Sequence, residues 1–127
     1  MYKIRDHEAD ISIIFFDFSL PESVIDSINA FRDIICKECK STATSLEEIS
    51  VKVNPNYFFT DVLNRFIYIY ETSDVIPLEV LKFRIKDEFA LMNISMSTLE
   101  SPNHIPKAAS LPKFIDSPDT IEIIIDL

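Results

Sequence analysis

The segment LEVLKFRIKDEFALM, residues 78–92, decides which α+β fold this sequence predicts. Its apolar residues recur three or four positions apart from Leu78 to Met92, which fits one face of a helix. In its middle part, LKFRIK, apolar and basic residues also alternate, which fits a strand. The content of Leu, Glu, Lys, Arg, Ala and Met favours the helix, because these residues have high helix propensity. The alternative is a hairpin that turns near Lys86 to Glu88.

Another helix is predicted earlier in the chain, from Leu20 to about Lys40. Ser19 followed by Glu22 three residues later is a capping-box pattern, and Pro21 suits a first helical turn. One face of this helix is apolar and consists of Val24, Ile28, Phe31, Ile35 and Cys39. The opposite face carries Glu22, Asp26, Asn29, Asp33 and Lys40.

Four short segments rich in β-branched and aromatic residues are predicted strands: residues 11–18, 49–53, 66–70 and 121–125. Four prolines fall between Glu100 and Asp119, which indicates a long extended loop that could be functional. With residues 78–92 as a helix, the order of elements is βαββαβ, the ferredoxin-like order. We therefore expect one α+β domain over residues 1–127, mainly an antiparallel sheet with one or two helices packed on it.

The composition narrows the possible functions. The chain has a net charge of −9 and no glycine, where average usage gives roughly nine. Phosphate-binding loops, dinucleotide-binding turns and nucleophile elbows all need glycine, so the sequence excludes them. It has no apolar run of about 18 residues and no signal-peptide pattern at its start, so we expect a cytoplasmic protein without a membrane span.

The CKEC segment, Cys36 to Cys39, resembles a redox or metal motif. Redox cysteine pairs usually sit at a helix N-terminus, whereas these lie at the C-terminal end of the predicted helix, where the helix dipole disfavours a thiolate. A zinc site would need both cysteines together with His7 and His104, whose spacing fits no zinc module. We interpret Cys36 and Cys39 as small core or boundary residues, and we expect no catalytic set, metal site or cofactor.

Acidic residues gather in two parts of the chain. Residues 6–31 contain six acids and no Lys or Arg, and residues 114–127 contain four acids and no base. In a ferredoxin-like sheet these two parts lie near each other, so the acids predict a surface that binds a basic protein. The predicted partner-binding residues are Asp17, Glu22, Asp26, Asp33, Asp116, Asp119 and Glu122.

The basic residues predict no nucleic-acid interface. Lys82, Arg84 and Lys86 form the only tight basic group, and Asp87 and Glu88 follow it at once.

In its small size, acidic charge and lack of catalytic motifs the chain resembles bacterial immunity proteins of contact-dependent inhibition and other polymorphic toxin systems. The resemblance implies an antitoxin that covers the cationic active site of a basic toxin, such as a nuclease. One alternative is a small enzyme or ligand-binding domain with an unrecognised pocket. Another is a structural homo-oligomer, in which an exposed edge strand at residues 120–126 pairs with a second copy.

Overall fold

A computed structural model describes residues 1–127 except 7–9, 17–18, 36–42, 55–56, 99–105 and 116. The described residues form two helices and eight strands. In chain order these are β1 (Tyr2–Asp6), β2 (Asp10–Phe16), α1 (Leu20–Ile35), β3 (Ser45–Lys52), α2 (Phe58–Ser73), β4 (Val75–Lys86), β5 (Phe89–Thr98), β6 (Ala108–Ala109), β7 (Lys113–Ile115) and β8 (Ser117–Asp126).

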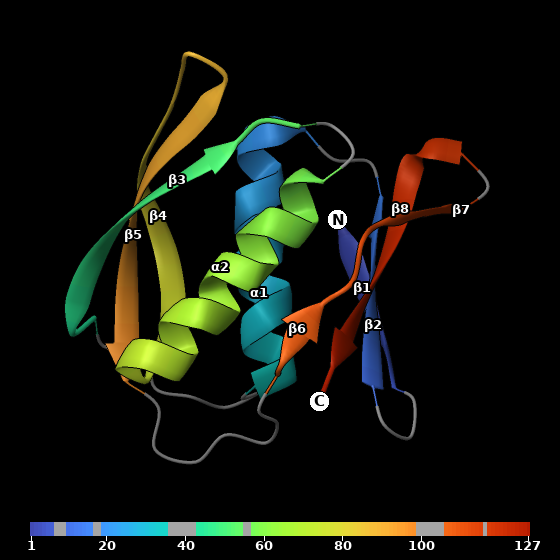
Figure 1. Ribbon diagram of the computed structural model, residues 1–127, viewed down its shortest axis with the longest axis horizontal. Helices are drawn as coiled ribbons and strands as arrows, with labels where there is room; N and C mark the ends of the chain where they lie inside the picture. Colours follow the sequence, from blue (N-terminus) through green and yellow to red (C-terminus); the bar gives the residue numbers. More distant parts are fainter. Residues whose placement is uncertain (7–9, 17–18, 36–42, 55–56, 99–105, 116) are drawn as a thin grey trace.

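The fold has three layers, with both helices between two antiparallel sheets (Figure 1). One sheet has the strand order β1-β2-β8-β6, and β7 also pairs with β8. The other sheet has three strands in the order β3-β5-β4. The predicted α+β class, with helices packed on antiparallel sheets, is confirmed. The ferredoxin-like order is wrong, because the chain builds two separate sheets.

Helix α1 confirms the predicted helix over residues 20–35, and residues 36–40 lie outside the described part of the chain. The backbone N–H of Ser23 donates to the carbonyl of Ser19 at 2.8 Å, which closes the first turn. The expected apolar face is buried at Val24, Ile28 and Phe31. It packs in the core because its apolar residues recur with the helical period.

Residues 78–92 form a hairpin, so the helix predicted there is wrong and the alternative is confirmed. Strand β5 lies between β3 and β4, so its backbone groups find partners on both sides. The turn consists of Asp87 and Glu88, whose φ angles are 51° and 70°. Two central residues with positive φ fit a type I′ turn, whose twist matches that of the strands. Tertiary pairing therefore overrides the helix propensity of this segment.

Helix α2 contains residues 66–70, FIYIY, which the sequence predicted to be a strand. The prediction was wrong because α2 is buried on more than one side, between the two sheets (Figure 1). A helix in such a place is apolar around most of its circumference, so its sequence resembles that of a buried strand. Phe66, Ile67 and Ile69 are all buried, and Tyr68 is exposed.

Strand β8 confirms the strand predicted near the C-terminal end, but β8 is not an edge strand. It pairs with β2 on one side, from Asp10↔Asp126 to Phe16↔Thr120, and with β6 and β7 on the other. The homo-oligomer hypothesis, which required an exposed edge at residues 120–126, therefore loses its basis. Residues 108–115 also carry two short strands, so the expected loop over residues 100–119 is wrong in its second part.

Aromatic rings connect the layers of the core. Phe15 on β2 stacks on Phe59 of α2 with ring centroids 4.1 Å apart, and Phe31 on α1 meets Phe66 of α2 edge to face at 5.7 Å. These contacts add specific geometry to the apolar area that the rings bury. No described helix is long and apolar enough to span a membrane.

Candidate functional site: the open face of the three-stranded sheet

The three-stranded sheet has one face covered by the helices and one face on which no described helix or strand packs. The helices pack against the side that carries Ile49, Val51, Ala90, Met92 and Ile94, all of which are buried. Because side chains alternate along a strand, the intervening residues point away from the helices. We call this surface the open face; its residues are Leu46, Glu48, Ser50, Lys52, Glu79, Lys82, Arg84, Lys86, Phe89, Leu91 and Asn93.

The strand register arranges these residues in rows across the sheet. Nearest the hairpin turn, Phe89 lies between Lys52 and Lys86. In the next row Leu91 lies between Ser50 and Arg84. Phe89 is 41% exposed, so an aromatic ring is accessible between two ammonium groups. The end of the open face near the turn is therefore cationic with apolar groups among the charges.

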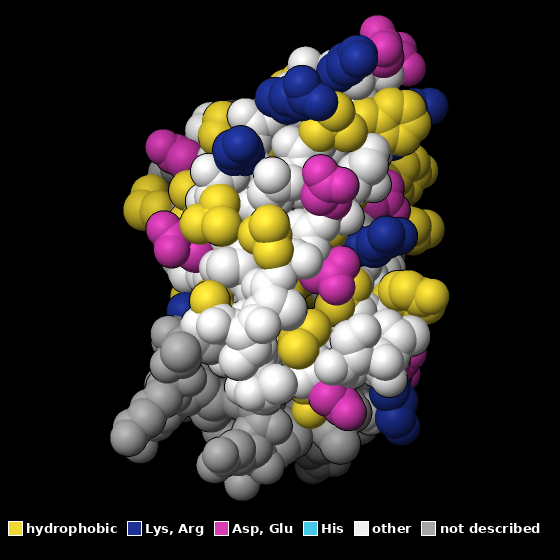
Figure 2. Space-filling model, turned by 90° about the vertical axis from the view of Figure 1, so that its left-hand side faces the viewer, with side chains coloured by type: hydrophobic (Ala, Val, Ile, Leu, Met, Phe, Trp, Pro, Cys, Tyr) yellow, Lys and Arg dark blue, Asp and Glu magenta, His cyan; other side chains and the backbone are white. Residues whose placement is uncertain are grey.

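The rows farther from the turn have a different character. Asn93 lies between Glu48 and Lys82, and Ser95 lies between Leu46 and Glu79. Two carboxylates thus stand at the end of the open face that is remote from Lys86. Figure 2 looks onto this face: Lys and Arg side chains lie towards its upper end with acidic side chains beside them at the tip, above a mixed area of acidic, polar and apolar side chains.

A hollow of about 770 Å³ lies in the middle of the open face. Its lining comprises the open-face residues Glu48, Ser50, Lys82, Arg84, Leu91 and Asn93. Ile49, Phe83 and Met92, which alternate with these residues and belong to the helix-facing side, also contribute atoms to the lining. The hollow falls within the size range of ligand pockets and has the usual mixture of apolar and polar groups. All of its lining residues come from β3, β4 and β5, so no loop residue contributes to it.

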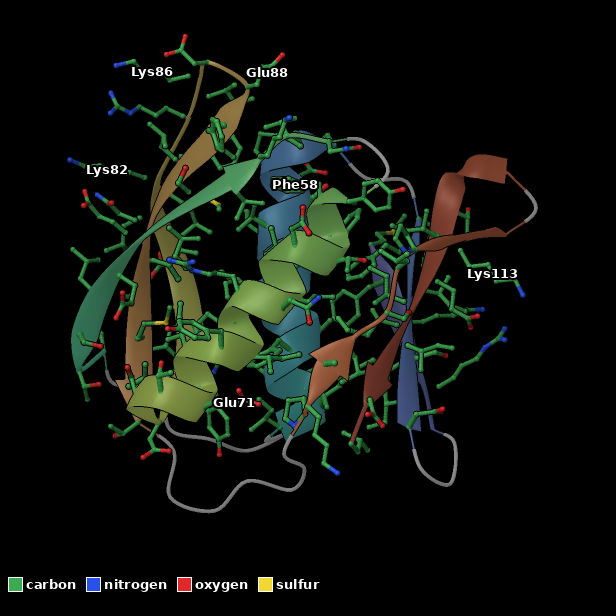
Figure 3. All side chains as sticks on the ribbon, viewed as in Figure 1. Phe58, Glu71, Lys82, Lys86, Glu88 and Lys113 are labelled. Carbon is green, nitrogen blue, oxygen red and sulfur yellow. The ribbon has the colours of Figure 1, made fainter. Side chains whose placement is uncertain are left out.

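The cations of the open face are available to a ligand. Lys52, Lys82, Arg84 and Lys86 are exposed, and none of them is within ion-pair distance of an acid among the described residues. Figure 3 shows Lys82 extending away from the sheet, and Lys86 and Glu88 extending in different directions at the turn. The sequence signal for this site is the alternation of Lys82, Arg84 and Lys86, which Asp87 and Glu88 obscure because they follow it directly.

Two of the predicted partner-binding acids on α1 contact the first two residues of the chain, Met1 and Tyr2. The α-amino group of Met1 donates to a carboxylate oxygen of Asp26 at 2.6 Å. The hydroxyl of Tyr2 donates to Asp33. Burial raises the pKa of Tyr2 well above its usual range, and the hydrogen bond and charge of Asp33 raise it further. Asp26 and Asp33 therefore hold the first strand against the helix.

Of the other predicted acids, the structure describes the side chains of Glu22 and Glu122, which lie on different elements. Glu22 is exposed on the first turn of α1. Glu122 on β8 lies between Ile121 and Ile123, which face the core, so it points to the opposite side of the five-stranded sheet from α1. Asp17 and Asp116 lie outside the described residues, and only the backbone of Asp119 is described.

The four residues considered for a redox or metal role, Cys36, Cys39, His7 and His104, lie outside the described part of the chain. Among the described residues no group of three or more His, Cys, Asp or Glu side chains is placed to hold a metal ion.

Two solved structures share this fold. A solution structure of protein 1598 from Methanobacterium thermoautotrophicum has 16% identity and a TM-score of 0.69, and the match covers 99% of this chain and 98% of that one. A crystal structure from Thermotoga maritima, described as an archease and possible chaperone, has 18% identity and a TM-score of 0.60, with 99% and 95% covered. No curated protein sequence matches the chain.

A comparison with models of protein families shows which family the chain belongs to. The model of the Archease protein family matches residues 2–115. The expected resemblance to immunity proteins is therefore wrong, and with it the expected role as an antitoxin against a basic toxin. That resemblance relied on size, charge and missing motifs, which many unrelated small domains share. Because the match extends over most of its length, the chain belongs to the archease family.

Proposed function

We propose that this protein acts without catalysis, as a chaperone-like factor that holds a segment of another protein on the open face. The Thermotoga maritima structure is described as a possible chaperone, and at 18% identity its likeness supports a shared fold. The proposal therefore depends on a feature of this chain itself.

That feature is the hollow in the open face. A chaperone needs an accessible surface that offers apolar contact together with polar groups that keep it soluble. Leu46 is 56% exposed at one end of the open face, and Phe89 is 41% exposed at the other, with the hollow between them. The hydrophobic side chains of Leu81 and Ile85 are also exposed on the same hairpin.

The test is suppression of client aggregation. The protein is mixed with citrate synthase at 43 °C as a model client, and light scattering is followed over time. We expect the wild type to delay scattering and the double variant Leu46→Ser/Phe89→Ser to lose most of that effect. The control is Ile25→Ser/Leu111→Ser, which removes two exposed apolar residues that lie outside the open face.

Circular dichroism before the assay shows whether each variant is folded at that temperature. Equal suppression by both double variants would overturn the assignment of the open face. A wild type that does not delay scattering at any ratio to the client would overturn the proposed function.

A further inference from the structure

The charge on the open face changes along the strands. Lys52, Arg84 and Lys86 occupy the rows nearest the turn, and Lys82 follows in the third row opposite Glu48. Beyond that row lies Glu79. Four cations thus lie on one face of a protein with net charge −9, and the exposed acids Asp87 and Glu88 lie beyond them at the turn.

The spacing of these cations fits an extended chain. Lys82, Arg84 and Lys86 alternate along β4, and their register with β5 has no irregularity from Lys82 onward. Side chains on one face of a strand repeat about every 6.7 Å, so the three cations span about 13 Å. An extended peptide segment has the same repeat, so acids at alternate positions of a ligand match the three cations in register.

The lining of the hollow adds an apolar requirement. Leu91 lies beside Arg84 in the second row, and its partly exposed side chain faces the same space. A ligand that carries only charge leaves this contact unused, whereas a ligand with an apolar side chain next to its acids uses both.

The change from cations near the turn to acids farther along the open face favours a protein segment over a nucleic acid as the ligand. A phosphate chain carries one negative charge at each nucleotide, so a strand that continued along the face would meet Glu48 and Glu79. The net charge of −9 adds repulsion at longer range. A peptide avoids the contacts with Glu48 and Glu79, because its acids can be confined to one end of the bound segment and its total charge can be small.

We propose that the open face selects an extended protein segment with acids at alternate positions and a neighbouring apolar side chain. The acids contact Lys82, Arg84 and Lys86, and the apolar side chain enters the hollow beside Leu91. This inference rests on the proposed function and names the chemical class of its partner.

The experiment begins with a random dodecapeptide library displayed on phage and selected against the full-length protein. We expect the selected peptides to be enriched in Asp or Glu at alternate positions, with an adjacent apolar residue. The most enriched peptide is then synthesised with a fluorescent label, and its affinity is measured by anisotropy at low and moderate salt.

Two matched charge reversals test the site. The triple variant Lys82→Glu/Arg84→Glu/Lys86→Glu is expected to bind this peptide about tenfold or more weakly than the wild type. The control, Lys3→Glu/Arg5→Glu/Lys113→Glu, changes the net charge by the same amount on the other sheet, and its affinity should stay within about twofold of wild type. Thermal unfolding followed by circular dichroism verifies that both variants are folded.

The outcomes separate this inference from the proposed function. Selected peptides without acids, or equal weakening by the two reversals, overturn the inference. If the selected peptides lack acids but bind the Leu46→Ser/Phe89→Ser variant more weakly than the wild type, the proposed function stands. A third outcome is that the library yields no binders, the wild-type protein binds a 20-nucleotide thymidine oligonucleotide, and Lys82→Glu/Arg84→Glu/Lys86→Glu abolishes that binding. This result overturns both the inference and the proposed function in favour of a nucleic-acid site. A library without binders and no oligonucleotide binding overturns this inference, and the aggregation assay then decides the proposed function separately.

Discussion

The side chain of Asn64 on α2 pairs with both backbone polar groups of Ala109 on β6. The N–H of Ala109 donates to Oδ1 of Asn64 at 2.8 Å, and Nδ2 of Asn64 donates to the carbonyl of Ala109 at 3.2 Å. One turn earlier on α2, the hydroxyl of Thr60 donates to the carbonyl of Ser110 at 2.7 Å. A helix thus supplies the hydrogen bonds that a neighbouring strand would give β6, and it fixes part of the Pro-rich segment in place.

Replacing Asn64 with Ala is expected to lower the free energy of unfolding by about 2 kcal/mol, because two partly buried backbone groups lose their partners. Urea denaturation followed by circular dichroism measures this change. The control is Asn29→Ala on the exposed side of α1, which should change stability by less than about 0.5 kcal/mol. Equal midpoints for the two variants would show that the Asn64 contacts do not stabilise the fold.

The hairpin turn offers a stabilising substitution. Asp87 and Glu88 adopt left-handed conformations in a chain that has no glycine. Glu88→Gly is expected to raise the free energy of unfolding by about 1 kcal/mol, because glycine has no β-carbon to clash in this conformation. The same replacement at Glu48, a strand position without positive φ, should lower it by about 1 kcal/mol. Loss of stability in both variants would be inconsistent with the turn geometry.

Because of Tyr2, the free energy of unfolding is expected to depend on pH in the alkaline range. Its folded-state pKa is raised, so the neutral phenol is favoured in the folded protein. The resulting stability is fully present below the unfolded pKa of about 10 and is lost as pH rises above it towards the folded pKa. Tyr2→Phe should lower stability by about 1 kcal/mol at pH 8, because the hydrogen bond to Asp33 is lost.

The free energy of unfolding, measured by urea titration from pH 8 to 11.5, should fall less steeply above pH 10 in Tyr2→Phe than in the wild type. Asp33→Asn removes a charge that raises the pKa of Tyr2, so it should also reduce the alkaline loss. Tyr70 has a raised pKa as well, caused by burial and by Asp74, so part of the loss should remain in both variants. Parallel pH profiles in all three proteins would contradict this role for Tyr2.

Neighbouring residues of α2 test its position between two sheets. Phe66 and Ile67 are adjacent and both buried, whereas Tyr68 is 58% exposed. Phe66→Ala should lower the free energy of unfolding by about 3–5 kcal/mol, and Ile67→Ala by about 2–5 kcal/mol. Tyr68→Ala should change it by about 1 kcal/mol or less. Urea denaturation distinguishes these cases, and a large effect at Phe66 and Tyr68 with a small one at Ile67 would indicate a strand.

The elements that were predicted correctly are those whose periodicity has one interpretation. Residues 20–35 carry an unbroken helical face, and residues 49–52 and 121–125 have strand composition. Residues 78–92 fitted two periods at once. Three residues of the expected helix face, Leu81, Ile85 and Phe89, are exposed in the hairpin. The pairing with β3 that selects the strand lies almost 40 residues away in sequence, beyond the range of any local pattern.

The open face was missed for the same reason. Lys82, Arg84 and Lys86 share a face only if the segment is a strand, and Lys52 joins them only through the register of β3 with β5. Acids that follow closely in sequence, such as Glu88, can then extend elsewhere. The acids that stood out in the sequence include Asp26 and Asp33, which contact Met1 and Tyr2. Local charge counts give no information on which acids have internal partners.

The pairing of β2 with β8 has a consequence for the order of events during protein synthesis. Ile11, Ile13 and Phe15 emerge from the ribosome early. Their respective partners, Ile125, Ile123 and Ile121, emerge more than 100 residues later. The β3, α2, β4 and β5 elements are complete before β8 exists. Contacts of such large sequence separation form slowly, so the nascent chain carries an unpaired apolar strand edge for most of its translation.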